Sequence, residues 1–196
     1  MSPQAPAPAR PMRADARRNR ERILTAAAAE FEEHGPEAAL EDIASRAGVG
    51  IGTLYRHFPD RQALLVAVYR EGVDSLVHCG DELLAADDPF DGLARWLGAQ
   101  LEHSRKHQSL AASAMLNMLD DPDGPPPPCE AMMTTGAALL ARAQERGVVR
   151  ADVDASDVSR MVGAIALATD GAPDGPVCSN RLFQVMLDGL RPPAER

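Results

Sequence analysis

Residues 40–58, LEDIASRAGVGIGTLYRHF, constrain the fold more than any other stretch of the chain. Apolar residues recur at helical spacing on both sides of Gly48, so each side predicts a short helix with one apolar face. A glycine in this place is typical of the positive-φ residue that closes a helix. Gly50 can then begin the second helix after a turn of about three residues. This pattern is that of a helix-turn-helix, whose second helix enters the major groove of DNA.

The same stretch resembles the DNA-binding signature of TetR-type transcriptional regulators. The resemblance covers roughly residues 18–70, and the residues in register are Ile43-Ala44, Ala47-Gly48-Val49, Gly52-Thr53-Leu54-Tyr55, His57-Phe58 and Leu64. The stretch around 139–167 is similar to the SbtR-like branch of the family's C-terminal domains. The resemblance implies an all-α fold in which a three-helix N-terminal helix-turn-helix unit precedes a helical bundle for ligand binding and dimerisation.

The second helix of the predicted helix-turn-helix carries most of the candidate DNA contacts. Residues 50–53 are mostly small, which lets the unpaired N–H groups of the helix N-terminus approach phosphate. Tyr55 and His57 can donate hydrogen bonds to phosphate oxygens or base edges. The resemblance implies that residues 50–53 face the bases, and that Leu54 and Phe58 belong to the core. The predicted DNA-binding residues are Gly50, Ile51, Gly52, Thr53, Tyr55, Arg56, His57 and Arg61.

Two positions depart from the pattern of the family. Gly50 replaces the usual Ser or Thr, and Ile51 replaces a frequent Lys or Arg, so a base-contacting side chain is lost. One alternative to a DNA-binding regulator is therefore a small-molecule-binding dimer with degraded DNA binding. The alternative for Tyr55 and His57 is a purely structural place at the edge of the core.

Charge is distributed unevenly along the 196 residues. The whole chain has a net charge of −9, yet residues 1–22 hold six arginines against Asp15 and Glu21, a local net charge of +4. An acidic body with a relatively basic end keeps DNA away from the wrong face. Proline and alanine dominate residues 1–16, which predicts a disordered arm. This arm is either a solvated tail or a source of DNA contacts from Arg10, Arg13, Arg17 and Arg18.

Helical periodicity continues along most of the chain. With the two helices of the helix-turn-helix, about nine helices are expected. The other predicted helices cover about 17–34, 61–85, 89–106, 109–119, 129–146, 155–168 and 179–190. Asp154 and Asp157 are expected to cap the helix that follows them, whereas the proline-rich residues 120–128 cannot be helical. We expect a DNA-binding domain over residues 17–60 and an effector-binding and dimerisation domain over residues 61–196.

The last two predicted helices are apolar over more than one face, which exceeds what a surface helix of a monomer needs. Both helices are either buried in the core or shared with a second subunit in a four-helix bundle. The predicted interface residues are Val158, Met161, Val162, Ile165, Leu182, Phe183, Met186 and Leu190. An effector pocket is expected between helices of the same domain, although Met and Trp at such spacing often belong to a core. Its candidates are Trp96, His103, Met115, Met118, Met132 and Met161.

Other functions find little support in the residues. His103 and His107 are one helical turn apart, but Lys106 beside them disfavours a metal ion. Reactive constellations of an enzyme, cofactor motifs and apolar runs long enough for a membrane span are all missing. Three widely spaced cysteines fit free thiols in a reducing, cytoplasmic compartment.

We therefore expect a ligand-responsive transcriptional regulator that acts as a repressor and uses neither metal nor cofactor. As a homodimer it would bind a pseudo-palindromic operator in double-stranded DNA, because one recognition helix binds too weakly to specify a site. A small-molecule effector would release it by shifting the helix that begins near Arg61.

Overall fold

The computed structural model describes residues 10–106 and 128–192, with side chains described from residue 14 and, after the gap, from residue 130. The described residues form eight α-helices and contain no β-strand, which confirms the predicted all-α fold. The helices are α1 (Arg10–His34), α2 (Leu40–Arg46), α3 (Ile51–His57), α4 (Arg61–Leu83), α5 (Pro89–Lys106), α7 (Pro128–Glu145), α8 (Ala155–Ala168) and α9 (Gly175–Leu190). The helix predicted over 109–119 lies outside the described residues.

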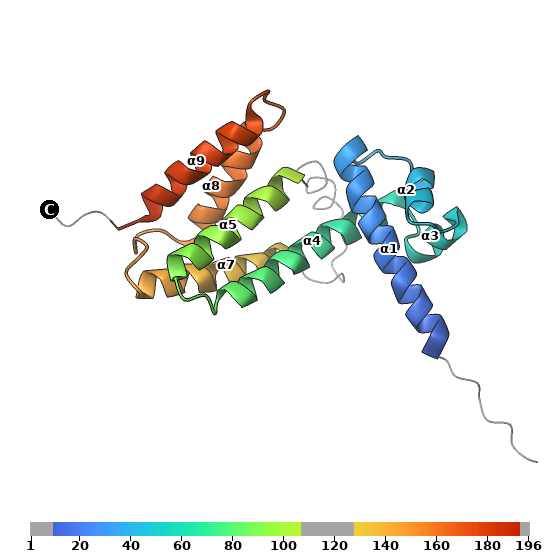
Figure 1. Ribbon diagram of the computed structural model, residues 1–196, viewed down its shortest axis with the longest axis horizontal. Helices are drawn as coiled ribbons and strands as arrows, with labels where there is room; N and C mark the ends of the chain where they lie inside the picture. Colours follow the sequence, from blue (N-terminus) through green and yellow to red (C-terminus); the bar gives the residue numbers. More distant parts are fainter. Residues whose placement is uncertain (1–9, 107–127, 193–196) are drawn as a thin grey trace, which may run out of the picture. The chain divides into compact units, whose positions relative to one another are not determined.

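The chain divides into two compact units, Met1–Val68 and Tyr69–Arg196. The first unit contains α1, α2 and α3, and the second contains α5, α7, α8 and α9 (Figure 1). Helix α4 begins in the first unit and ends in the second. A single helix is therefore covalently continuous across the boundary between the units.

The core of the first unit is built from the apolar faces of α1, α2 and α3. Ile23 of α1, Ile43 of α2 and Leu54 of α3 are completely buried. Gly48 has a φ of +63°, and its N–H donates to the carbonyl of Ser45. The predicted turn between two helices is therefore confirmed, and the glycine supplies the left-handed conformation that a side chain would disfavour.

Three arginines form hydrogen bonds between different segments of the first unit. Arg46 at the end of α2 donates to Glu30 of α1 at 3.0 Å and to Glu33 at 2.9 Å. Arg22 donates to the carbonyl of Gly48, and Arg61 donates to two carbonyls in the connection between α1 and α2. These bonds reinforce α2, which has no side-chain cap at its N-terminus.

Helix α1 begins earlier than the sequence predicts. We expected a disordered arm up to residue 16, but α1 starts at Arg10. Proline is tolerated in the first turn of a helix because its missing N–H has no helical partner there. The alanines and arginines that follow Pro11 are good helix formers, and Arg18 pairs with Asp15 one turn away. These local preferences outweigh the proline-rich composition.

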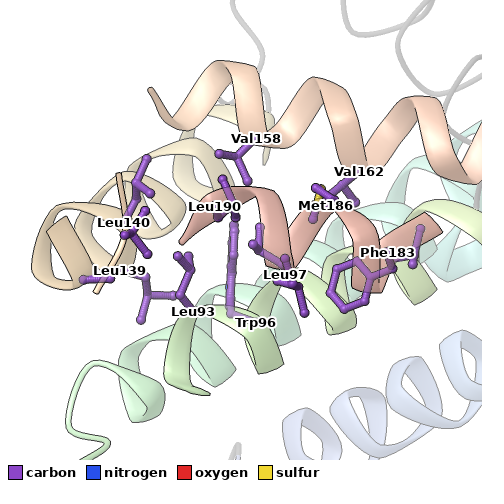
Figure 2. Packing of buried hydrophobic residues seen from close by; sticks show 14 of the residues in the cluster. Leu93, Trp96, Leu97, Leu139, Leu140, Val158, Val162, Phe183, Met186 and Leu190 are labelled. Carbon is purple, nitrogen blue, oxygen red and sulfur yellow. The ribbon is translucent and has the colours of Figure 1, made fainter. Parts of the chain in front are cut away.

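The second unit is organised around the buried indole of Trp96 (Figure 2). Side chains from α5, α7, α8 and α9 gather on it in one continuous apolar cluster. The indole Nε1–H donates to the carbonyl of Leu76 on α4 at 3.0 Å. Gly80 of α4 and Gly136 of α7 contact the indole, because a Cβ added at either would lie within 3.0 Å of it. The two glycines therefore shape the slot that the ring fills.

The boundaries of the remaining helices largely follow the expected caps. Asp154 and Asp157 form a reciprocal capping box at the start of α8, which confirms their predicted role. Helix α9 begins at Gly175 rather than at the predicted Ser179, because Pro176 falls in its first turn, where proline is compatible with a helix.

Candidate nucleic-acid interface

Helix α3 presents one face to the core and the opposite face to solvent. Leu54 is completely buried and Phe58, which follows the helix, is also buried, as predicted. Ile51 and Tyr55 lie on the opposite side of the helix and are 37% and 47% exposed. The exposed glycines before and within α3 leave the backbone between them accessible. The outward face therefore combines an accessible helix N-terminus with an exposed phenol group.

Thr53 and Arg56 are arranged around the same turn of α3. The guanidinium group of Arg56 donates to the carbonyl of Gly52 at 3.1 Å and to the hydroxyl of Thr53 at 3.2 Å. Because the Thr53 oxygen accepts in this contact, its own hydrogen remains able to donate to a phosphate oxygen. Arg56 thus lies along the helix, with its charge next to the proposed contact of Thr53.

Arg61 has a different environment from the other predicted DNA-binding residues. It is half-buried, and its Nη1 donates to the carbonyls of Pro36 and Ala38. These bonds give Arg61 a structural role, in which it holds the segment that leads into α2. His57 is also half-buried and lies beside the ring of Phe58, with 6.4 Å between the ring centroids.

One basic residue near α3 was not selected from the sequence. Arg20 of α1 is exposed, and its guanidinium carbon lies 5.6 Å from the centroid of the Phe58 ring. Because Phe58 directly follows α3, this contact places Arg20 at the C-terminal end of the recognition helix. The only sequence signal is its spacing of three and four residues from the apolar Ile23 and Leu24.

Glu30, Glu33 and His34 form the one cluster of possible metal ligands found among the described residues. Arg46 donates hydrogen bonds to the carboxylates of Glu30 and Glu33. The bond to Glu33 holds the pKa of that carboxyl below its ordinary value. Hydrogen bonds to both glutamates raise the pKa of Arg46 itself. The cluster is therefore an ion-pair clamp between α1 and α2, with its carboxylates already neutralised by a cation.

The predicted interface residues separate into two groups in the structure. Val158, Val162 and Phe183 are buried in the core of the single chain. Met161 and Leu182 are exposed. Ile165, Met186 and Leu190 are buried but line a groove between α8 and α9.

This α8–α9 groove is almost entirely apolar. It has a volume of about 480 Å³, and its lining residues are Arg150, Val153, Met161, Ala164, Ile165, Leu182, Val185, Met186, Gly189 and Leu190. Val185 is 64% exposed and was not selected from the sequence, although it lies one turn after Leu182 on the same face. An apolar surface of this kind marks an interaction site more often than a solvated face.

The four candidate pocket residues that the structure describes do not form one cluster. Trp96 is enclosed in the core and Met132 packs against it, whereas Met161 lines the α8–α9 groove. His103 lies beside Tyr69, with 5.4 Å between the ring centroids. Met115 and Met118 lie outside the described residues.

A buried amide was missed by the sequence analysis. Gln100 of α5 is 3% exposed, and its Nε2 donates to the hydroxyl of Ser159 at 2.8 Å. Its Oε1 accepts no hydrogen bond from the part of the chain that the structure describes. A buried acceptor of this kind costs free energy unless water or a ligand satisfies it. A glutamine within the apolar stripe of α5 was the available signal.

The fold and the exposed face of α3 define a helix-turn-helix transcriptional regulator, and comparison with known proteins identifies the family. Residues 23–68 match the N-terminal domain of the tetR family of bacterial regulatory proteins. Residues 88–192 match the C-terminal domain of SbtR-like transcriptional regulators. The chain therefore belongs to the TetR family, whose members are non-enzymatic regulators that bind DNA and act as dimers with ligand effectors.

Particular relatives support this assignment over different lengths. An HTH-type transcriptional regulator of Staphylococcus aureus is 42% identical over 67 residues, which is 34% of this chain and 36% of the relative. The chain thus matches only about a third of the length of its curated relatives. A TetR regulator of Streptomyces coelicolor is 35% identical, with a TM-score of 0.76 over 89% of this chain and 99% of the other. A TetR regulator of Mycobacterium vanbaalenii is 36% identical, with a TM-score of 0.73 over 93% and 100% of the two chains.

Membership of this family bears out the expectation that the chain is not an enzyme. Within the described ranges, no helix is long and apolar enough to cross a membrane.

Proposed function

We propose that the protein is a ligand-responsive transcriptional repressor. In this proposal a homodimer binds a pseudo-palindromic operator in double-stranded DNA, and a small-molecule effector releases it. The first unit of the chain binds DNA, and the second unit binds the effector and forms the dimer. Because its partner is DNA, we place the protein in the cytoplasm.

The exposed face of α3 is the observation that carries the DNA-binding part of this proposal. Gly50, Ile51 and Gly52 at its N-terminus would lie against the base edges, where small residues permit close approach. Tyr55 would bind the phosphate backbone through its exposed hydroxyl. Thr53, Arg56 and His57 would add contacts from the same helix, whereas Arg61 would act mainly by holding α2 in place.

The α8–α9 groove supports the proposed homodimer. Met161 of α8 and Leu182 and Val185 of α9 project from the walls of the groove and are exposed in a single chain. A second copy would bury these side chains and complete a four-helix bundle of two α8 and two α9 helices. Such a two-fold interface uses the same surface from each subunit, which matches the symmetry of a palindromic operator.

The proposed release mechanism uses the continuity of α4. An effector in the second unit would displace the part of α4 that carries Leu76, and the same helix continues to Arg61 in the first unit. The spacing between the two recognition helices would then no longer match one turn of DNA, about 34–36 Å. Couplings of this kind typically amount to about 1–3 kcal/mol. In this proposal the effector donates a hydrogen bond to the buried Oε1 of Gln100, which accepts none within the described residues.

A binding titration against the DNA that flanks the gene of this protein tests the proposal. We expect sequence-selective binding that weakens steeply as salt increases, with two protomers or a multiple per site. The alternative, a small-molecule-binding dimer with degraded DNA binding, is favoured by the missing side chain at Gly50 and the apolar Ile51. It predicts no selective binding even at low salt, and that result would replace the repressor proposal.

Replacement of Tyr55 tests the proposed phosphate contact directly. Tyr55→Phe removes only the hydroxyl group, whereas Tyr55→Ala removes the whole side chain from an exposed position. Both variants should weaken binding to all DNA sequences alike, because a phosphate contact reads no base. Because the phenol group is uncharged, both variants should keep the salt slope of the wild-type protein. Unchanged affinity in both variants would remove Tyr55 from the interface.

A further inference from the structure

Two exposed arginines lie on one face of the N-terminal half of α1. Leu24, Ala27 and Phe31 are buried where α1 packs in the first unit. Continued towards the N-terminus at the same alternating spacing of three and four residues, this helical face reaches Arg20 and then Arg17. Both side chains are exposed, and we call the pair the α1 arginine stripe.

The contact between Arg20 and Phe58 locates the stripe relative to the recognition helix. Phe58 directly follows α3, so the stripe begins beside the C-terminal end of that helix. From there α1 continues towards its N-terminus beyond α2 and α3, as Figure 1 shows. Arg17 follows Arg20 in this direction after about 4.5 Å along the helix axis. The stripe thus lies on the face of α1 that packs against the helix-turn-helix.

Among the described residues, acidic side chains neutralise the stripe only weakly. Asp15 lies on the other side of α1, where it pairs with Arg18. Glu21 approaches Arg17 at 3.6 Å, but the two side chains are 62% and 77% exposed. Ion pairs with this degree of exposure are weak. The Arg17 guanidinium group can therefore leave Glu21 and bind a phosphate group instead. The stripe is therefore a surface of positive charge beside α3.

We propose that the α1 arginine stripe binds the phosphate backbone of DNA next to the groove that α3 enters. This inference rests on the proposed DNA binding and extends it by a second contact surface. Guanidinium groups bind phosphate oxygens in a bidentate manner, and each contact releases condensed counterions from the DNA. The stripe therefore adds affinity and salt dependence without reading sequence.

Helical structure makes this proposal different from binding by a basic tail. In a disordered arm, neighbouring arginines are equivalent, and only their number matters. On a helix, Arg17 and Arg18 are about 100° apart, and only Arg17 belongs to the stripe. The two residues are otherwise well matched, because both are exposed and each has one acidic partner within a helical turn.

This matched pair provides the test. Arg17→Gln and Arg18→Gln are compared with the wild-type protein in binding to a short random-sequence duplex, over salt concentrations of about 50–200 mM. We expect Arg17→Gln to reduce the slope of log affinity against log salt by about 0.9 per protomer. Arg18→Gln should leave the slope unchanged, and Arg17→Lys should restore most of it because the charge is retained. Circular dichroism checks that both glutamine variants keep their helix.

Each possible outcome decides between the proposals. Equal losses of slope in Arg17→Gln and Arg18→Gln would overturn the stripe and indicate a tail that acts through net charge. No loss in either variant, with normal binding by the wild-type protein, would also overturn the stripe but leave the helix-turn-helix proposal intact. A wild-type protein that does not bind the duplex at low salt would overturn both proposals.

Discussion

Replacement of Gly136 by alanine tests whether the slot around Trp96 determines the stability of the second unit. An added Cβ would lie 2.7 Å from Cη2 and 2.8 Å from Cζ3 of the indole. The ring cannot easily retreat, because its Nε1 is bonded to the carbonyl of Leu76 and Gly80 contacts it from α4. Gly136→Ala therefore forces either the ring or α7 to move.

The expected cost follows from this geometry. Overpacking a well-filled core by one methyl group typically costs about 1–3 kcal/mol, whereas replacing glycine by alanine within a helix gains about 1 kcal/mol. Gly163→Ala in α8 is a matched control, because no atom lies within 4 Å of the added Cβ. The helical gain is common to both variants, so their difference in unfolding free energy should equal the packing cost of about 1–3 kcal/mol.

Urea and thermal unfolding followed by circular dichroism measure this difference, at one protein concentration because a dimer is expected. For a chain of this length, 1 kcal/mol corresponds to about 2–4 °C in Tm. The Tm and the urea midpoint of Gly136→Ala should be equal to those of the wild-type protein or lower, and clearly lower than those of Gly163→Ala. If Gly136→Ala were as stable as Gly163→Ala, the slot would not be tightly packed and the reasoning would be refuted.

Three further predictions concern the interface, a cap and the clamp between helices. Val185→Lys, in the α8–α9 groove, should convert the dimer to a monomer in analytical ultracentrifugation, whereas Val177→Lys, equally exposed but outside the groove, should not. The hydrogen bond from the backbone N–H of Asp157 holds the pKa of the Asp154 carboxyl below its ordinary value. The stabilisation from this cap is therefore complete above the pKa of Asp154 in the unfolded chain, and it disappears as the pH falls through the pKa in the folded protein. Asp154→Asn, which still accepts the hydrogen bond, should therefore flatten the fall of Tm in acid, and an equally steep fall would count against the cap. Arg46→Gln should lower Tm at neutral pH, because it leaves a buried glutamate of α1 without its main cation; an unchanged Tm would show the clamp to be dispensable.

Local patterns in the sequence were sufficient for the helix-turn-helix. The positive φ of Gly48 and the burial of Leu54 and Phe58 depend on neighbours within a few residues, so helical periodicity and turn chemistry predict them. The cap of α8 was predictable for the same reason. The start of α1 was not, because prolines near residue 10 suggested disorder, whereas helix propensity and an ion pair extend the helix.

Features that depend on distant residues escaped prediction. Helices α8 and α9 are apolar on more than one face, so periodicity alone cannot tell the buried Val162 from the exposed Val185. The enclosure of Trp96 by glycines of two other helices likewise requires the tertiary structure. The interface residues predicted from sequence therefore include both core and surface positions of the single chain, and the four described pocket candidates are dispersed.

The bond between Trp96 and the carbonyl of Leu76 has a practical consequence for optical spectroscopy. Trp96 is the only tryptophan of the chain, and it belongs entirely to the second unit. Its emission is therefore sensitive to the separation of α4 from α5 and is not mixed with light from an indole in the DNA-binding unit. Unlabelled protein can thus report effector-induced movement of α4 by its own fluorescence, while a dye on the DNA reports occupancy of the operator in the same cuvette.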